Sequence, residues 1–90
     1  MAVLNFTKQS NGYWRADATA YADFAVQLNR ADSGRVIISR SFINDSDKEA
    51  VFAEHRGKTF TQSFEDNIYP QYLHIESESE VTHGEIIEAE

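Results

Sequence analysis

Apolar and polar residues alternate along most of the chain, and this alternation predicts a protein built of β-strands. From Trp14 to Leu28 the even positions are apolar and most odd positions are polar. Successive side chains point to opposite faces of a strand, so one face of this stretch should be buried and the other wet. The run is long for a single strand. We therefore expect a bend near 21–23, where the chain passes from one sheet to another.

Turn residues divide the rest of the chain into further strands. We expect strands over 2–8, 13–20, 23–30, 35–43, 59–65, 72–77 and 81–89, the last interrupted at Gly84. The Ser10–Gly12 and Ala31–Gly34 segments have the composition and length of hairpin turns. About seven or eight short strands without a βαβ pattern predict an all-β fold. The expected architecture is an antiparallel β-sandwich, jelly-roll-like or immunoglobulin-like, forming a single domain over residues 1–90.

Residues 44–57 fit two different elements. Ser46 to Glu49 matches a capping box and Gly57 stands where a helix would stop, which predicts a short helix near 47–56. The same residues also fit a strand with both faces partly covered, flanked by turns. We favour the strand and keep the helix as the alternative.

One parity within each strand supplies the expected core. The residues predicted to be buried are Trp14, Phe24, Val26, Leu28, Val36, Ile38, Leu73 and Ile75, with Phe42 on the same face as Val36 and Ile38.

Charge is distributed unevenly along a chain whose net charge is −7. All eight Lys and Arg residues lie within 1–58, whereas 59–90 holds eight acids and no Lys or Arg. An acidic protein repels phosphate backbones and anionic lipid, so nucleic acid and membranes are poor partners. Since no signal segment or long apolar run is evident, we expect a cytoplasmic or virion-associated location. The strand bearing Glu76, Glu78 and Glu80 is expected to form a self-repelling sheet edge.

Catalytic chemistry has little support in the sequence. There is no cysteine and no Gly-x-Ser-x-Gly turn, and the carboxylates fall on wet faces or in turns. We therefore predict that the chain is not an enzyme and uses no cofactor. Asp45, Asp47 and Glu49 alternate as calcium ligands do, but Ala50 and Arg56 break the EF-hand pattern. No metal site is expected, with calcium at these three acids as a minor alternative.

Histidines offer one further metal candidate. His74 and His83 fall on strands that follow one another in the sequence, so they could meet near Glu76 and hold zinc. They lack the local spacing of established zinc sites, and two surface imidazoles are the expectation.

Tyrosines on outward positions and in a loop are the best candidates for binding. They are Tyr13, Tyr21, Tyr69 and Tyr72. Aromatic side chains on a flat β-face stack on sugar rings or become buried in protein interfaces, where tyrosine is enriched.

Two segments resemble the C-terminal part of small β-sandwich proteins of tailed bacteriophages and prophages. These segments are Ile68–Ser77 and Glu80–Ile86, and the opening Leu4–Thr7 with Gly12-Tyr13-Trp14 is similar too. The resemblance implies a structural or accessory part of a virion, with no catalytic residues to carry over. The predicted function is therefore a non-catalytic module that acts by assembling with protein, most simply as a homo-oligomer. The alternative is a carbohydrate-binding module that uses the four tyrosines.

Overall fold

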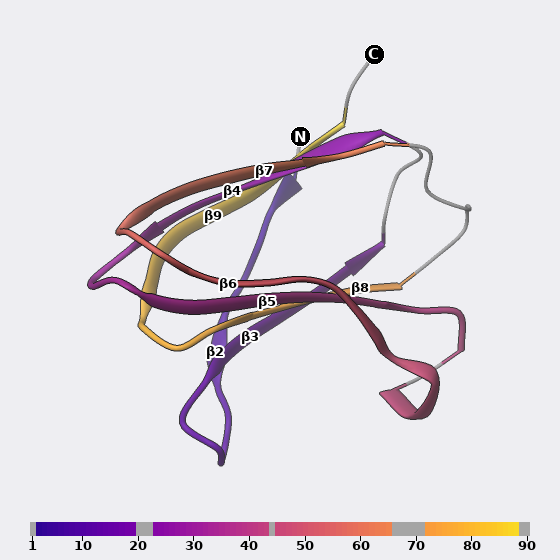
Figure 1. Cartoon of the computed structure of the whole chain (residues 1–90), viewed down its shortest axis with the longest axis horizontal. Coiled ribbons are helices and arrows are strands. Elements are labelled where there is room, and N and C mark those ends of the chain that lie inside the picture. The colour runs from indigo at the N-terminus through magenta and orange to yellow at the C-terminus, as the bar shows by residue number, and fades with distance from the viewer. Residues whose placement is uncertain (1, 20–22, 44, 66–71, 89–90) are drawn as a thin grey trace.

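Two antiparallel sheets face each other in the computed structural model, as the alternation predicts (Figure 1). The structure describes residues 2–19, 23–43, 45–65 and 72–88, with only the backbone of Asp45. Its elements are β1 (Ala2–Val3), β2 (Thr7–Lys8), β3 (Trp14–Thr19), β4 (Phe24–Arg30), β5 (Gly34–Ser41), the 3-10 turn η1 (Asp45–Asp47), β6 (Glu49–Arg56), β7 (Thr59–Phe64), β8 (Tyr72–Ser77) and β9 (Val81–Glu88). The fold is therefore an all-β sandwich.

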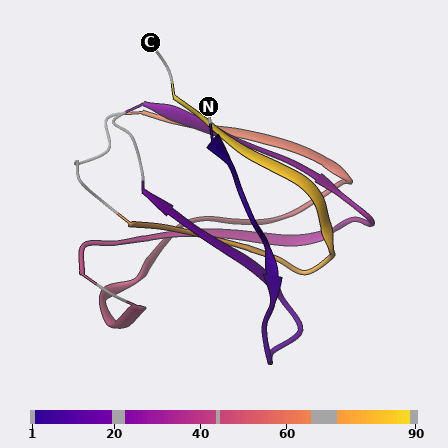
Figure 2. The same cartoon turned by 180° about the vertical axis from the view of Figure 1, so that it is seen from behind.

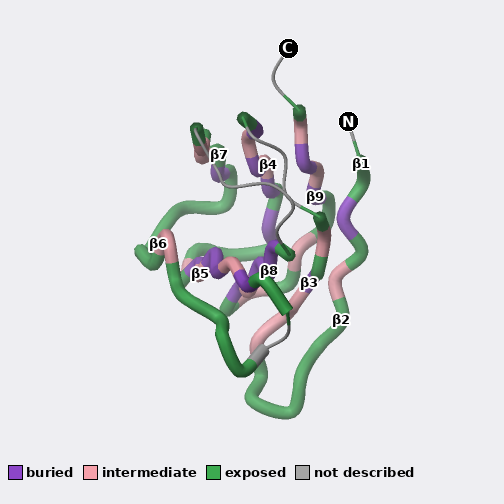
Figure 3. The backbone as a smooth tube through the Cα atoms, turned by 90° about the vertical axis from the view of Figure 1, so that its right-hand side faces the viewer, coloured by how far each residue is buried: buried purple, intermediate pink, exposed green. Residues whose placement is uncertain are grey.

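Strand order places most strands that are consecutive in the sequence in different layers. One sheet has the order β1-β9-β4-β7 and the other β2-β3-β8-β5-β6. Figure 3 looks along the sandwich and shows β7 and β6 on one side, with β1 and β2 on the other. The view from behind in Figure 2 shows the N-terminal segment passing from one layer to the other. β8 is an inner strand, so the prediction that the acidic segment around Glu76 forms a sheet edge is wrong.

Alternation along β4 and its neighbours builds the core between the sheets. The buried apolar residues are Leu4, Ala16, Phe24, Val26, Leu28, Val36, Ile38, Phe60, Leu73, Ile75 and Ile86. Burial of each Val, Leu, Ile or Phe side chain in this set contributes about 1.5–3 kcal/mol to the free energy of unfolding. The register brings Leu28 opposite Phe60, and Ile38 opposite Ile75. Seven of the eight residues predicted to be buried are confirmed.

Trp14 is the exception among these eight residues, and Phe42 departs from the face on which it was expected with Val36 and Ile38. Trp14 is only partly buried, because it opens β3 beside the two-residue β2, where the sheet margin gives little cover. Phe42 is 55% exposed. β5 ends at Ser41, so the parity that buries Val36 and Ile38 no longer holds at Phe42.

The ambiguous stretch after Phe42 is resolved as a tight loop followed by a strand. Asp47 Oδ2 accepts hydrogen bonds from the backbone N–H groups of Phe42 and Ile43, at 2.9 and 3.2 Å, and so closes the loop. β6 then pairs with β5 over its length. The favoured strand is thus confirmed, and the helical signal corresponds only to η1.

Several connections cross between the sheets where hairpins would stay within one. The crossing expected near 21–23 is confirmed, because β3 and β4 lie in different sheets; residues 20–22 are outside the described part of the chain. The Ala31–Gly34 link also crosses, so its assignment as a hairpin turn is wrong. Ser10–Gly12 does form a hairpin turn, with Gly12 at φ 89°, a conformation that favours glycine.

The buried side chain of Arg30 holds together three connections that cross between the sheets at one end of the sandwich. It is 4% exposed, and its Nη2 donates to the carbonyls of Gly34, Arg56 and Gly57 at 3.2, 2.8 and 2.7 Å. Its Nη1 donates to Ser77 Oγ at 3.2 Å. Burial lowers the pKa of Arg30, which the charges of Glu78 and Asp32 partly offset. One guanidinium therefore ties the β4–β5, β6–β7 and β8–β9 connections together.

The first predicted strand, 2–8, is instead two short strands in different sheets. β1 pairs with β9 and β2 pairs with β3, and the chain crosses between them. Leu4 is buried at this crossing, and its N–H donates to the Gly84 carbonyl at 2.8 Å. β9 runs through Gly84 without the expected interruption. A glycine is needed there because a Cβ would lie 2.8 Å from Phe6 and 3.0 Å from Leu28.

Adding that methyl group should therefore destabilise the protein. We expect Gly84→Ala to lower the free energy of unfolding by about 1–3 kcal/mol, the usual cost of overpacking. Gly57→Ala is the matched control, because a Cβ at Gly57 meets nothing within 4 Å. Urea denaturation of both variants measures the difference. Equal midpoints for the two variants would contradict the close approach of Phe6 to Gly84.

Candidate functional site

A polar cluster lies on the outer face of the five-stranded sheet, across three adjacent strands. His74 on β8 stands opposite Asp17 on β3 and Ser39 on β5 in the register. Alternation places the three outside because their neighbours Ala16, Ile38 and Ile75 point into the core. Ser41 comes two residues after Ser39 on β5 and so lies on the same face of the strand. Residues far apart in the sequence are thereby brought to one place.

Hydrogen bonds within this cluster follow the order of a Ser-His-Asp triad. Ser41 Oγ lies 2.7 Å from His74 Nε2, and His74 Nδ1 lies 2.9 Å from Asp17 Oδ1. A neutral imidazole with its proton on Nδ1 would donate to Asp17 and accept from the Ser41 hydroxyl. Arg15 Nε donates to the same carboxylate oxygen at 2.9 Å. Arg15 Nη2 also lies 3.1 Å from His74 Nδ1, which is a close approach and not a hydrogen bond in that tautomer, since both atoms are donors.

Burial in this cluster is the reverse of what nucleophilic catalysis needs. Ser41 is 1% exposed and His74 is 5% exposed, whereas the side chain of Asp17 is 59% exposed. In serine hydrolases the nucleophile is presented to the substrate and the carboxylate is buried. A carbonyl substrate cannot reach Ser41 Oγ in this arrangement. The cluster instead cross-links β3, β8 and β5.

The surroundings of Asp17 change the ionisation of its carboxyl group. Partial burial raises its pKa, but hydrogen bonds from His74 and Arg15, together with the charges of both, lower it further than burial raises it. The net result is a pKa below the ordinary value of 3.8. The ionised carboxylate is thus favoured in the folded chain.

This shift predicts how stability depends on pH. Because the pKa of Asp17 is lower in the folded state, its stabilisation is fully present above pH 3.8 and is lost as pH falls through the folded-state pKa. We expect Asp17→Asn to be less stable than the unmodified protein at neutral pH, with the difference shrinking in acid. Urea titrations at steps of pH measure it. A difference that stays constant below pH 3.8 would indicate a packing effect and contradict the charge account.

The predicted binding tyrosines do not form one platform in the described part of the chain. Tyr13 is partly buried and precedes β3, at the end where Trp14 pairs with Ser77. Tyr72 is 51% exposed at the opposite end of the same strand pair. Five residues of strand separate these ends, or about 17 Å. Tyr21 and Tyr69 lie outside the described residues.

Metal-binding candidates are dispersed. Asp47 closes the β5–β6 loop through its carboxylate, Glu49 is exposed at the start of β6, and the side chain of Asp45 lies outside the described part. His74 and His83 do not face each other, because β8 and β9 belong to different sheets. His83 Nε2 is instead 2.6 Å from Glu85 Oε1. Within the described ranges, no three His, Cys, Asp or Glu residues are grouped as metal ligands.

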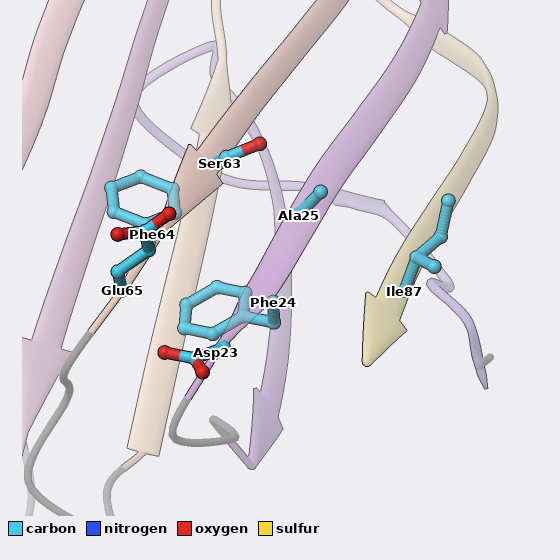
Figure 4. Close-up of a pocket in the computed structure, with 7 residues that line it drawn as sticks. All are labelled: Asp23, Phe24, Ala25, Ser63, Phe64, Glu65 and Ile87. Atoms are coloured by element: carbon cyan, nitrogen blue, oxygen red, sulfur yellow. The ribbon is translucent and has the colours of Figure 1, made fainter. Parts of the chain in front are cut away.

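A shallow hollow opens at the end of the four-stranded sheet (Figure 4). Its volume is about 230 Å³, which is below the usual range of small-molecule sites. The rings of Phe24 and Phe64 stack there with centroids 5.1 Å apart, beside Asp23 and Glu65. No Lys, Arg or His is among the described residues that line the hollow.

Three of the four sheet edges carry features that discourage pairing with another chain. β1 and β2 are only two residues long. β6 has eight residues, but its register with β5 shifts between Ile38 and Ser39, and it carries Glu49, Glu54 and Arg56. Short strands, irregular register and charge are the means by which natural edges avoid aggregation.

The edge of β7 has none of these features. Its six residues, Thr-Phe-Thr-Gln-Ser-Phe, include no charge and no proline, and their register with β4 is regular. Among the described strands β7 is the last of its sheet, so within that part of the chain one side of its backbone has no strand partner. Such an edge is a ready template for a further strand.

Comparison with known proteins adds no relative. No family model, curated protein or solved structure matches the chain. Among the described residues, no helix is long and apolar enough to span a membrane.

Sequence reasoning missed the Ser41–His74–Asp17 cluster and the exposed edge of β7. Asp17 and His74 each show the outward parity of their strands, which is the only local signal of the cluster. Which strands are neighbours could not be read from that parity, because β3, β8 and β5 are not consecutive in the chain. The low charge of 59–64 was visible in the sequence, but its position at an edge was not.

Proposed function

We propose that this chain is a non-catalytic assembly module that binds protein by adding a strand to the edge of β7. The observation that supports this proposal is the contrast between β7 and the other three edges. An unprotected edge of six residues offers backbone donors and acceptors that another strand can satisfy. Its side chains alternate, so a partner strand would meet phenylalanines on one face and hydroxyls on the other.

The polar cluster is consistent with a module that is not an enzyme. Its serine is inaccessible, and its hydrogen bonds tie three strands of the opposite sheet together. With the five-stranded sheet cross-linked in this way, the four-stranded sheet that ends in β7 is the proposed binding layer. A structural or accessory role in a larger particle, which the sequence resemblance implies, fits this arrangement.

A peptide with the sequence of Lys58–Glu65 tests the proposed edge directly. We expect it to bind and to shift the backbone amide resonances of β7, because it can supply a strand with complementary alternation. A scrambled peptide of the same composition is the control. Thr61→Lys combined with Ser63→Lys should abolish binding by charging the edge.

A matched variant separates the edge from the face of the sheet. Asn29→Lys adds charge to the same outer face, but on β4, which is paired on both sides. It should leave peptide binding unchanged. If protein that sediments as a monomer shows no shift of any β7 amide at millimolar peptide concentration, the proposed function is wrong.

A further inference from the structure

We infer that the strand that pairs with β7 is β7 of a second copy of this chain, in an antiparallel register centred on Gln62. This inference rests on the proposed function and names its partner. The two four-stranded sheets would join edge to edge into one continuous sheet. The result is a closed dimer with two-fold symmetry.

The alternation of β7 restricts the registers that such a dimer can adopt. Phe60, Gln62 and Phe64 share the core side of the sheet, because they pair with Leu28, Val26 and Phe24. Thr61 and Ser63 share the outer side. In an antiparallel pair, directly opposite residues lie on the same face. A two-fold axis must therefore pass through a residue of β7 and not between two residues.

Centring the axis on Gln62 gives the best cross-strand pairs. Phe60 then stands opposite Phe64 of the second copy, and Thr61 opposite Ser63 of the second copy. Aromatic pairs and hydroxyl pairs are among the favourable neighbours in sheets. Centring on Thr61 would instead place Phe60 against Gln62 and Phe64 against Lys58. The register centred on Gln62 is thus the one that pairs both phenylalanines of each β7 with phenylalanines of the other copy.

The other edges explain why the assembly would stop at two copies. A head-to-tail chain of sandwiches would need β7 to pair with β1, which offers only two residues. Pairing of β7 with itself uses residues 60–64 on both copies and leaves no free β7 edge. The arrangement is closed, so the dimer is protected from growing into fibres.

Charge sets the salt dependence of this dimer. Each copy carries a net charge of −7, and β7 itself carries none. Repulsion between the copies is long-range and is screened by salt, whereas strand pairing is not. The dimer should therefore strengthen as salt is added.

Disulfide trapping tests the register, since the chain has no cysteine of its own. Residues opposite each other on antiparallel strands have Cα atoms about 4.5–5.5 Å apart, which a disulfide can span. Gln62→Cys should cross-link to itself about tenfold faster than Thr61→Cys under mild oxidation. A mixture of Thr61→Cys and Ser63→Cys proteins should cross-link to each other. Faster self-linking of Thr61→Cys would overturn the register.

Charge exchange provides a second test without oxidation. Gln62→Lys and Gln62→Glu should each be monomeric in sedimentation velocity, because like charges would face each other across the axis. Mixing the two should restore a dimer. Circular dichroism of each variant establishes that it is folded.

The outcomes separate this inference from the proposed function. A dimer of the unmodified protein that strengthens with salt supports the inference. A monomer at millimolar concentration that still binds the Lys58–Glu65 peptide overturns the inference and leaves the proposed function standing. Species that grow beyond the dimer with concentration overturn the closed arrangement.

Discussion

Replacing Arg30 by alanine is expected to destabilise the fold more than any other single charge removal. The guanidinium supplies donors to three backbone carbonyls and one hydroxyl at the end of the sandwich. Leaving these acceptors without a donor should cost about 3–5 kcal/mol. The total free energy of unfolding of a chain of 90 residues is roughly 5–14 kcal/mol. The variant should therefore unfold at a much lower urea concentration.

Two further variants make the result specific. Arg35→Ala removes an equal charge from an exposed position nearby and should change stability little. Arg30→Lys keeps the charge but lacks the planar fork of donors, so it should recover only part of the loss. If Arg30→Ala and Arg35→Ala shared one urea midpoint, Arg30 would not hold the three connections together.

Truncating Leu28 should have the second-largest effect. Leu28 is fully buried on the central part of β4, between Phe60 on β7 and Gly84 on β9. Leu28→Ala removes buried methyl groups and leaves a cavity, which costs about 2–5 kcal/mol in packed cores. Thermal unfolding followed by circular dichroism measures the change.

Val3→Ala is the control for Leu28→Ala. Val3 is apolar but 61% exposed at the edge of the same sheet, so its truncation should shift the midpoint only slightly. Leu28→Ala with an unchanged midpoint would mean that the even positions of β4 do not face the core.

Strand positions and the core were predictable from the sequence because alternation is a local property. β8 coincides with the predicted 72–77, and the even positions of β4 are buried as expected. The pairing of strands is not local. The Ala31–Gly34 link has the composition of a hairpin turn, yet it crosses between sheets, and Arg30 holds this crossing by hydrogen bonds to the Gly34 carbonyl and the Ser77 hydroxyl.

For the candidate sites too, local features were predictable from the sequence, whereas contacts between distant strands were not. Asp47 and Glu49 were identified from spacing alone, and the structure uses the Asp47 carboxylate to close a loop. The contacts of His74 come from β3 and β5, whose proximity only the fold reveals. The bare edge of β7 was recognisable once its place in the sheet was known.

The position of β9 has a consequence for the order in which the protein can fold during synthesis. β9 is the last described strand of the chain, yet it lies between β1 and β4, the first and an early strand. Until Val81–Glu88 has left the ribosome, β4 lacks one neighbour and β1 lacks its partner. The nascent chain would expose two open backbone edges during that interval. Completion of the four-stranded sheet therefore has to wait until Val81–Glu88 has emerged, and chaperones that shield exposed strands would matter most before that point.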